Sequence, residues 1–208
     1  MFQMSLYWSS ASPFVRKVMA SAHELSLAEG IEILESAAHP VVRDPRIQAF
    51  NPLARVPAAR MADGTVLYDS RVICEYLDEI AAAQGRAPRL FPTGAARWRA
   101  LRRQALADGL MEAGLLLRYE TLLRPAPLHW PLWIEKQGEK IADALDAMLA
   151  DLPDPETVDI GTITYACALG WLDFRFPDLD WRKGRGPLAD WHAACERRPA
   201  MLATRPCA

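Results

Sequence analysis

WSSASPFVRKV, residues 8–18, joins an apolar run to a helix-like segment and decides how the fold begins. Upstream, QMSLYW (3–8) is a short strand candidate. Downstream, PFVRKVMASAHEL (13–25) repeats apolar residues at helical spacing behind a proline suited to a first helical position. IEIL (31–34) then predicts a second strand. The order strand, helix, strand implies a parallel strand pair joined by a right-handed crossover.

The next segments predict a hairpin and a third helix. VPAARM (56–61) and TVLY (65–68) flank ADG (62–64), which has the composition of a hairpin turn. SRVICEYLDEIAAA (70–83) follows with one apolar stripe at helical spacing. We therefore expect an α/β unit, a small mixed sheet with helices packed on it.

The composition changes to Gly, Pro and Arg at GRAPRLFPTG (85–94), which predicts a linker over 84–94. The sequence after this linker predicts an all-α domain. Four helical segments are expected, at 96–120, 132–152, 159–176 and 187–199. The third has so few polar residues that we expect burial on almost all sides. The predicted division is therefore a first domain at 1–83 and an all-helical domain at 95–208.

The composition excludes several function classes. The chain has 208 residues, 51% hydrophobic and 24% charged, with no apolar run near the ~20 residues that a spanning helix needs. Its net charge is −2 without a dense basic run, so we expect no nucleic-acid partner. The first residues, MFQMSLYW, lack the pattern of a secretory signal, which favours the cytoplasm and no membrane partner.

The cysteines and histidines are scattered along the chain. They are Cys74, Cys167, Cys195, Cys207, His23, His39, His129 and His192. No C-x-x-C pair or ligand spacing is present, so we predict neither a metal site nor a disulfide framework.

Three serines precede the first helix, where free backbone N–H groups and the helix dipole favour an anion. A Ser hydroxyl without a base is better at donating a hydrogen bond to a thiolate than at attacking a substrate. His23, the nearest histidine, lies about two and a half turns along the helix, which disfavours a Ser-His-Asp triad. The alternative is that Ser12 only caps the helix.

NPLARVPAARMADGTVLYDSRVICEYL (51–77) contains a second candidate site. Pro57 precedes a strand, where a proline is awkward unless its peptide is cis or it lies at an edge. A cis bond would leave the Val56 backbone groups available to a ligand. Asp69 and Ser70 open the next helix, whose N–H groups can hold a ligand carboxylate while Asp69 holds an ammonium. Together they suit an amino-acid zwitterion, with a simple helix cap as the alternative.

In their order and spacing, SPFVRKV, NPLARVP, DSRVICEYLDE, the linker and DIGTITYACALGWLDFRFPDLDW resemble the cytosolic glutathione S-transferases nearly end to end. The chain looks most like bacterial members with a serine-type active site. The resemblance implies a thioredoxin-like N-terminal domain, βαβ-α-ββα, that binds glutathione as substrate or cosubstrate. It further implies a C-terminal helical bundle domain that helps bind a hydrophobic co-substrate, a role in detoxification, and a homodimer.

The resemblance also implies which serine acts. Ser12 stands where glutaredoxin-like and omega-type chains have the cysteine of C-P-F/Y, and Ser10 stands where zeta-type chains have their active serine. Delta-type chains have their active serine at the position that is Ala11 in this chain. We expect Ser12 or Ser10 to donate to the glutathione sulfur, with a slight preference for Ser12. The absence of a cysteine at these positions disfavours thiol-transfer chemistry.

Six further residues complete the glutathione site that the resemblance implies: Phe14, Arg55, Val56, Pro57, Asp69 and Ser70. Val56 and Pro57 match the backbone clamp on the cysteinyl part of glutathione. Asp69 and Ser70 match the γ-glutamyl site. Arg55 is expected to reach the glycyl carboxylate, or else to be a solvated surface charge.

The helical half offers weaker signals. Asp108 and Glu112 share a helix face, which we interpret as hydrated, with contact to the co-substrate or a partner subunit's cleft as the alternative. Tyr119 and Trp133 are co-substrate candidates by residue type, whereas Trp171 is expected in the core.

Three other positions concern packing. Cys74 and Cys167 are expected to be packing residues. Asp159 is expected to cap its helix alone, since Thr157 stands only two residues before it.

The function that these expectations favour is an enzyme, a glutathione transferase that directs the glutathione thiolate at a small hydrophobic electrophile. A glutathione-dependent isomerase or lyase, such as a maleylacetoacetate isomerase or an etherase, is the first alternative. The second is a non-catalytic glutathione-binding regulatory protein, which the intact V-P and D-S pairs disfavour.

Overall fold

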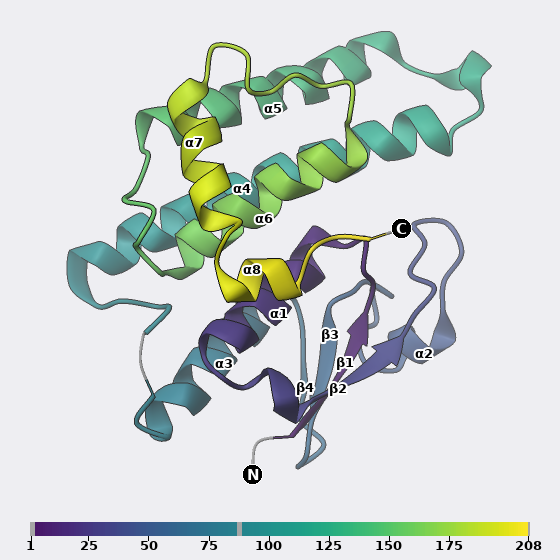
Figure 1. Ribbon diagram of the computed structural model, residues 1–208. Coiled ribbons are helices and arrows are strands. Elements are labelled where there is room, and N and C mark those ends of the chain that lie inside the picture. The colour runs from purple at the N-terminus through teal and green to yellow at the C-terminus, as the bar shows by residue number, and fades with distance from the viewer. Residues whose placement is uncertain (1–2, 87–88, 208) are drawn as a thin grey trace.

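The computed structural model describes residues 3–86 and 89–207, and Figure 1 shows a sheet with its helices beneath a set of longer helices. The strands are β1 (Met4–Trp8), β2 (Ile31–Glu35), β3 (Ala58–Met61) and β4 (Val66–Leu67). Their order across the sheet is β2-β1-β3-β4. β1 pairs parallel with β2 and antiparallel with β3, and β3 pairs antiparallel with β4. The mixed sheet expected from the sequence is confirmed.

Helices pack on both faces of this sheet. They are α1 (Pro13–Glu24), α2 (Pro45–Gln48) and α3 (Ser70–Ala83), with a short 3₁₀ turn, η1 (Ala28–Gly30). Because side chains alternate along a strand, Leu6 of β1 joins the large core with α1 and α3, whereas Tyr7 points to the α2 side. There the Tyr7 ring meets Phe50 edge-on, with ring centroids 4.7 Å apart.

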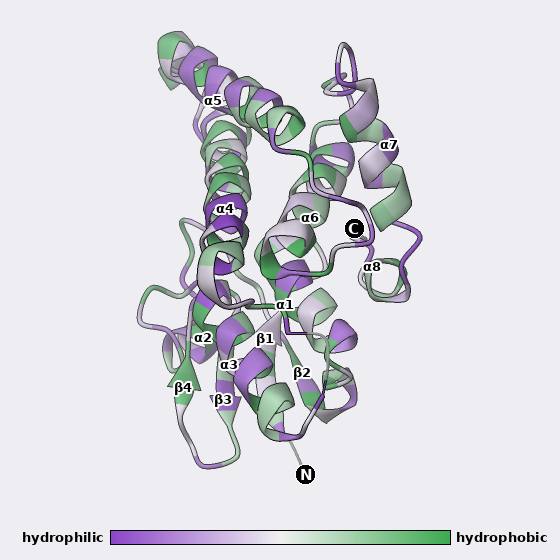
Figure 2. Ribbon diagram, turned by 90° about the vertical axis from the view of Figure 1, so that its left-hand side faces the viewer, coloured by the Kyte–Doolittle hydropathy of each residue, from purple (hydrophilic) through white to green (hydrophobic). Residues whose placement is uncertain are grey.

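The C-terminal half is helical. It comprises α4 (Gly94–Leu122), η2 (Ala126–Leu128), α5 (Pro131–Ala150), α6 (Ile160–Arg175), α7 (Gly186–Cys195) and α8 (Pro199–Ala203). α6 is buried along most of its length and packs against α4 and α1, so the burial expected for it is confirmed, as is that of Trp171. In Figure 2, α5 mixes hydrophilic and hydrophobic residues along its length, as an amphipathic surface helix does. Within the described ranges, no helix combines the length and apolar character needed to cross a membrane.

The segment between α3 and α4 is tied to both halves of the protein. The Leu90 N–H donates to the carboxylate of Asp78 on α3 at 2.6 Å, and the Leu90 C=O accepts from the N–H of Ile160, the first residue of α6, at 2.9 Å. Of the predicted linker at 84–94, residues 87–88 lie outside the described part of the chain. The division into domains stays a prediction, but Leu90 is anchored to both halves.

The start of α6 corrects one expectation from the sequence. Asp159 Oδ1 accepts from the Thr162 N–H at 2.9 Å, and Thr162 Oγ1 accepts from the Asp159 N–H at 3.0 Å. This is a complete capping box. The expectation that Asp159 caps alone is wrong, because its partner stands three residues after it rather than before it.

Replacing Thr162 by Val should therefore destabilise the protein. The substitution keeps the side-chain volume but leaves the buried Asp159 N–H without its acceptor, which we expect to cost about 1 kcal/mol of unfolding free energy. Urea denaturation measures the change. Thr157→Val is the matched control, because no hydrogen bond to the Thr157 side chain occurs among the described residues, and equal losses for the two variants would contradict a role for the box.

Candidate functional site

The strand register brings three loop segments to one edge of the sheet. Tyr7 of β1 lies opposite Ala58 of β3 in an antiparallel pair, so the residues after β1 adjoin those before β3. Leu67 of β4 lies opposite Ala59, which places the end of β4 at the same edge. The loops that meet there contain the predicted site residues, in the segments 9–12, 55–57 and 68–70.

Ser12 is the N-cap of α1. Its Oγ accepts a hydrogen bond from the Val15 N–H at 3.3 Å, and its own N–H donates to the Ser9 C=O at 3.1 Å. The cap uses a lone pair of the hydroxyl oxygen, so the hydroxyl proton is still able to donate to a ligand. Ser10 is half-buried, and no hydrogen bond to its hydroxyl occurs within the described residues.

The loop before β3 exposes backbone groups. The Val56–Pro57 peptide bond is cis, and neither the N–H nor the C=O of Val56 has a hydrogen-bond partner among the described residues. The buried side chain of Asn51 shapes the loop, because its Nδ2 donates to the Arg55 C=O and its Oδ1 accepts from the Leu53 N–H, both at 3.0 Å. Asn51 was not predicted from the sequence, although an Asn-Pro pair is typical of a turn.

Asp69 is the N-cap of α3 and lies exposed at the surface. Its Oδ1 accepts from the Arg71 N–H at 2.9 Å, while Oδ2 has no partner among the described residues. The cap that the sequence offered as an alternative is therefore present, and it leaves one carboxylate oxygen for a ligand. Ser70, the first helical residue, is only 2% exposed, so Asp69 is the more accessible of the two.

A buried charge network connects both helix starts to α4. The Lys17 ammonium on α1 donates to Asp108 Oδ1 at 2.6 Å, and Arg71 Nε on α3 donates to Asp108 Oδ2 at 2.8 Å. Lys17 and Asp108 are at most 1% exposed. The expectation of a hydrated face at Asp108 is wrong, because two cations from distant segments cover this carboxylate, whereas Glu112 on the same helix is exposed. The Asp108 carboxylate also raises the pKa of Arg71.

The aromatic co-substrate candidates lie in different settings. Burial raises the pKa of the Tyr119 phenol, and the charges of Arg55 and Arg118 partly offset that effect. Tyr119 of α4 thus lies within electrostatic reach of the loop before β3. Trp133 instead stacks on Trp130 at the start of α5, with ring centroids 6.2 Å apart.

The buried cysteines are packed side chains rather than reactive thiols. Burial raises the pKa of Cys74 to about 11 and that of Cys167 to about 12, and the packing role expected for them is confirmed. All four cysteines are free. Across residues 3–86 and 89–207, no three His, Cys, Asp or Glu side chains are grouped so that they would hold a metal ion.

Comparisons with known families identify the fold. A model described as glutathione S-transferase, N-terminal domain, matches residues 11–80, and one described as glutathione S-transferase, C-terminal domain, matches residues 96–194. An uncharacterized GST-like protein, YibF, from Escherichia coli strain K12 is 37% identical over 182 residues, which cover 86% of either chain.

Solved structures agree with these matches. A glutathione transferase family member from Pseudomonas fluorescens Pf-5, crystallised with bound glutathione, is 44% identical with a TM-score of 0.92, covering 99% of this chain and all of that one. A second structure of a family member from the same strain holds S-(propanoic acid)-glutathione, with 43% identity, a TM-score of 0.87 and the same coverage.

Removing the charge of Asp108 should be strongly destabilising. Asp108→Asn leaves the Lys17 ammonium buried without its ion-pair partner, which we expect to cost about 3–5 kcal/mol of unfolding free energy. Glu112→Gln removes the same charge four residues along α4 from an exposed site and should change the unfolding free energy by less than about 0.5 kcal/mol. Urea denaturation of both variants checks this, and similar values for the two would refute the structural role of the network.

Thiol titration tests the cysteine environments. Three thiols are buried. Burial raises the pKa of Cys195 to about 12 and also raises those of Cys74 and Cys167, so all three stay protonated at pH 8 and react slowly. Only the exposed Cys207 should react rapidly with a disulfide reagent in the native protein, and Cys207→Ser should abolish that fast phase. Rapid reaction of a second thiol in the native protein would contradict the structure. The urea-unfolded protein is the control, and all four of its thiols should react.

Proposed function

This chain belongs to the glutathione S-transferase family, and we propose that it is a glutathione transferase, which stabilises the thiolate of bound glutathione and directs it at a small hydrophobic electrophile. One observation supports this most. The starts of α1 and α3 meet at one edge of the sheet with the loop before β3, in which the Val56 N–H and C=O have no partner among the described residues. Such an edge offers hydrogen-bond donors, two helix dipoles and a free strand-like segment to one peptide ligand.

In this proposal each part of glutathione has its own partner. The N–H and C=O of Val56, held by the cis bond to Pro57, pair with the backbone of the cysteinyl residue. The free oxygen of Asp69 binds the γ-glutamyl ammonium, and the N–H groups at the Ser70 end of α3 face its carboxylate. The exposed Arg55 binds the glycyl carboxylate.

The thiol lies at the start of α1. A Ser hydroxyl and the helix N-terminus both favour a thiolate over a thiol, which we expect to lower the glutathione thiol pKa from its usual value near 8.5 by about one to two units. Each unit is about 1.4 kcal/mol of preference for the anion. Phe14, half-buried beside Ser12 in the chain, adds an apolar wall that excludes water from the sulfur.

One observation on a relative favours transfer over isomerisation. The Pseudomonas fluorescens protein was crystallised with S-(propanoic acid)-glutathione, a thioether of the kind that a glutathione thiolate forms with an electrophile. A transferase consumes glutathione in proportion to the electrophile, whereas an isomerase regenerates it. Product analysis on a panel of electrophiles that includes an α,β-unsaturated acid distinguishes the two.

We also propose a homodimer acting in the cytoplasm in detoxification. Exposed large apolar side chains on α3 and α4, namely Val72, Trp98 and Leu116, support a subunit interface. Light scattering of the purified protein tests the dimer.

Removing the hydroxyl that acts on the sulfur should lower turnover far more than glutathione affinity. We expect Ser12→Ala to reduce kcat at neutral pH by about 10- to 100-fold, to raise the pKa of bound glutathione by about one to two units, and to leave the Kd for glutathione within about threefold. Thiolate absorbance in the ultraviolet and calorimetry on the same sample give these quantities.

Two further variants complete the experiment. Ser12→Thr keeps a hydroxyl and a capping oxygen, so most activity should remain. Ser10→Ala tests the other candidate, and a large loss of turnover only in this variant would transfer the role to Ser10. If both alanine variants retain full turnover, or lose affinity and turnover equally, the proposed thiolate donor is wrong.

A further inference from the structure

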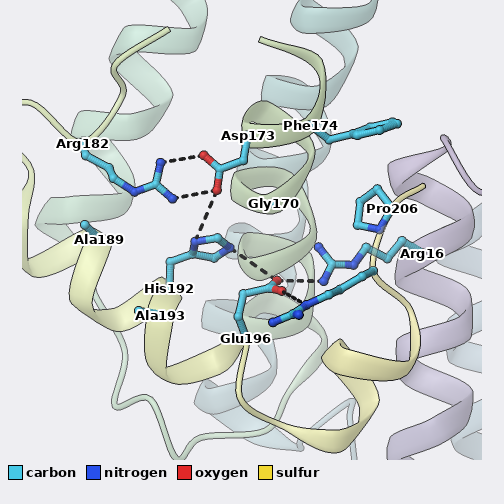
Figure 3. Close-up of a pocket in the computed structure, with 11 residues that line it drawn as sticks. Arg16, Gly170, Asp173, Phe174, Arg182, Ala189, His192, Ala193, Glu196 and Pro206 are labelled. Carbon is cyan, nitrogen blue, oxygen red and sulfur yellow. Dashed lines mark hydrogen bonds and ion pairs between the residues drawn. The ribbon is translucent and has the colours of Figure 1, made fainter. Parts of the chain in front are cut away.

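A cavity of about 450 Å³ lies between α6, α7 and the segment after α8 (Figure 3). None of the residues proposed to hold glutathione lines it. Its polar lining comes from Arg16, Asp173, Arg182, His192, Glu196 and Arg205. Three guanidinium groups and two carboxylates face one another here, which leaves one positive charge when His192 is neutral.

Arg16 on the cavity wall has unused hydrogen-bond donors. It is 4% exposed, and its Nη2 donates to Glu196 Oε1 at 2.7 Å and to the Met201 C=O at 3.2 Å. Its Nε and Nη1 are buried without a partner among the described residues. A guanidinium has five N–H donors, and leaving buried ones unpaired is costly. An acceptor that reaches this guanidinium would remove that cost.

The backbone of α6 makes room for this side chain. A Cβ on Gly170, in the middle of the helix and on the cavity wall, would collide with Arg16 Nη1. A glycine inside a helix is about 1 kcal/mol less favourable than alanine, so its presence here fits a guanidinium held against the helix.

The remaining charged groups of the lining are paired in such a way that the excess positive charge lies near the opening of the cavity. Arg182 forms a two-point ion pair with Asp173, with contacts of 2.6 and 2.7 Å. Arg205 is 62% exposed in its side chain, and its Nε lies 3.8 Å from Glu196 Oε2, too far for a hydrogen bond. His192 Nε2 lies 3.4 Å from Glu196 Oε1 and is buried, and it forms no hydrogen bond within residues 3–86 and 89–207.

We propose that this cavity binds an organic monocarboxylate with a small apolar body. Its carboxylate would accept from Arg16, His192 and Arg205, and one negative charge balances the excess of the lining. Its apolar part would lie along Phe174, Ala189 and Pro206, which also line the cavity. The volume falls within the range of small-molecule sites.

The test is a calorimetric titration of the whole protein with benzoate, and with benzamide as a neutral probe of the same shape. It requires no glutathione, so its result is independent of the proposed transferase activity. We expect saturable benzoate binding and at least tenfold weaker benzamide binding. Equal affinity for the two probes would overturn the proposal, as would tighter binding of inorganic phosphate than of benzoate.

Two matched pairs of variants locate the site. Ala193 is exposed on the α7 wall of the cavity, so Ala193→Glu adds a negative charge there and should weaken benzoate binding at least tenfold, whereas Ala193→Gln adds the same bulk and should stay within about threefold. Arg205→Gln should weaken binding at least fivefold. Arg197→Gln removes an equal charge from a neighbouring exposed residue outside the lining and should have no effect. If the two variants of either pair change the benzoate affinity equally, benzoate does not bind in this cavity.

Discussion

The buried carboxylate of Asp108 links the two helices that form the candidate site. It accepts from Lys17 of α1 and from Arg71 of α3, the two helices whose N-termini meet at the sheet edge. Breaking a buried ion pair is much more costly than its net contribution to stability, so the network strongly favours one arrangement of α1 and α3 against α4. The helix starts at Ser12 and Asp69 are therefore held by the C-terminal half, although both belong to the sheet-containing half.

α6 supports the same arrangement. α1 packs against it, and the capping box at Asp159 fixes where it begins. Close approach of α4 requires small residues, because a Cβ on Gly114 would overlap the Trp171 ring and one on Gly161 would overlap the Ala100 C=O. Since interiors pack as densely as crystals, this contact leaves α6 little freedom to move. The helix behind the site is thus a rigid support for the start of α1.

Local sequence patterns predicted most of the fold. The features that they did not predict depend on contacts between residues far apart in the chain. The helix at 70–83 and the hairpin before it follow from periodicity and turn composition, and the strand order explains why the serines, Val56 and Asp69 meet. Helical spacing relates Asp108 only to neighbours such as Glu112, whereas Lys17 lies 91 residues away along the chain. Likewise, Arg16 and Glu196 are separated by 180 residues, so no local pattern connects them.

The position of Ser12 gives a physical reason to prefer it over Ser10 as the thiolate donor. A hydroxyl that accepts a hydrogen bond is polarised by it and becomes a stronger donor, because chains of hydrogen bonds reinforce one another. The Val15 N–H donates to Ser12 Oγ, so capping the helix and stabilising a thiolate act in the same direction. Among the described residues, no donor of this kind reaches the Ser10 hydroxyl. The helix cap and the thiolate donor are thus compatible roles of one oxygen, and the cap strengthens the donor.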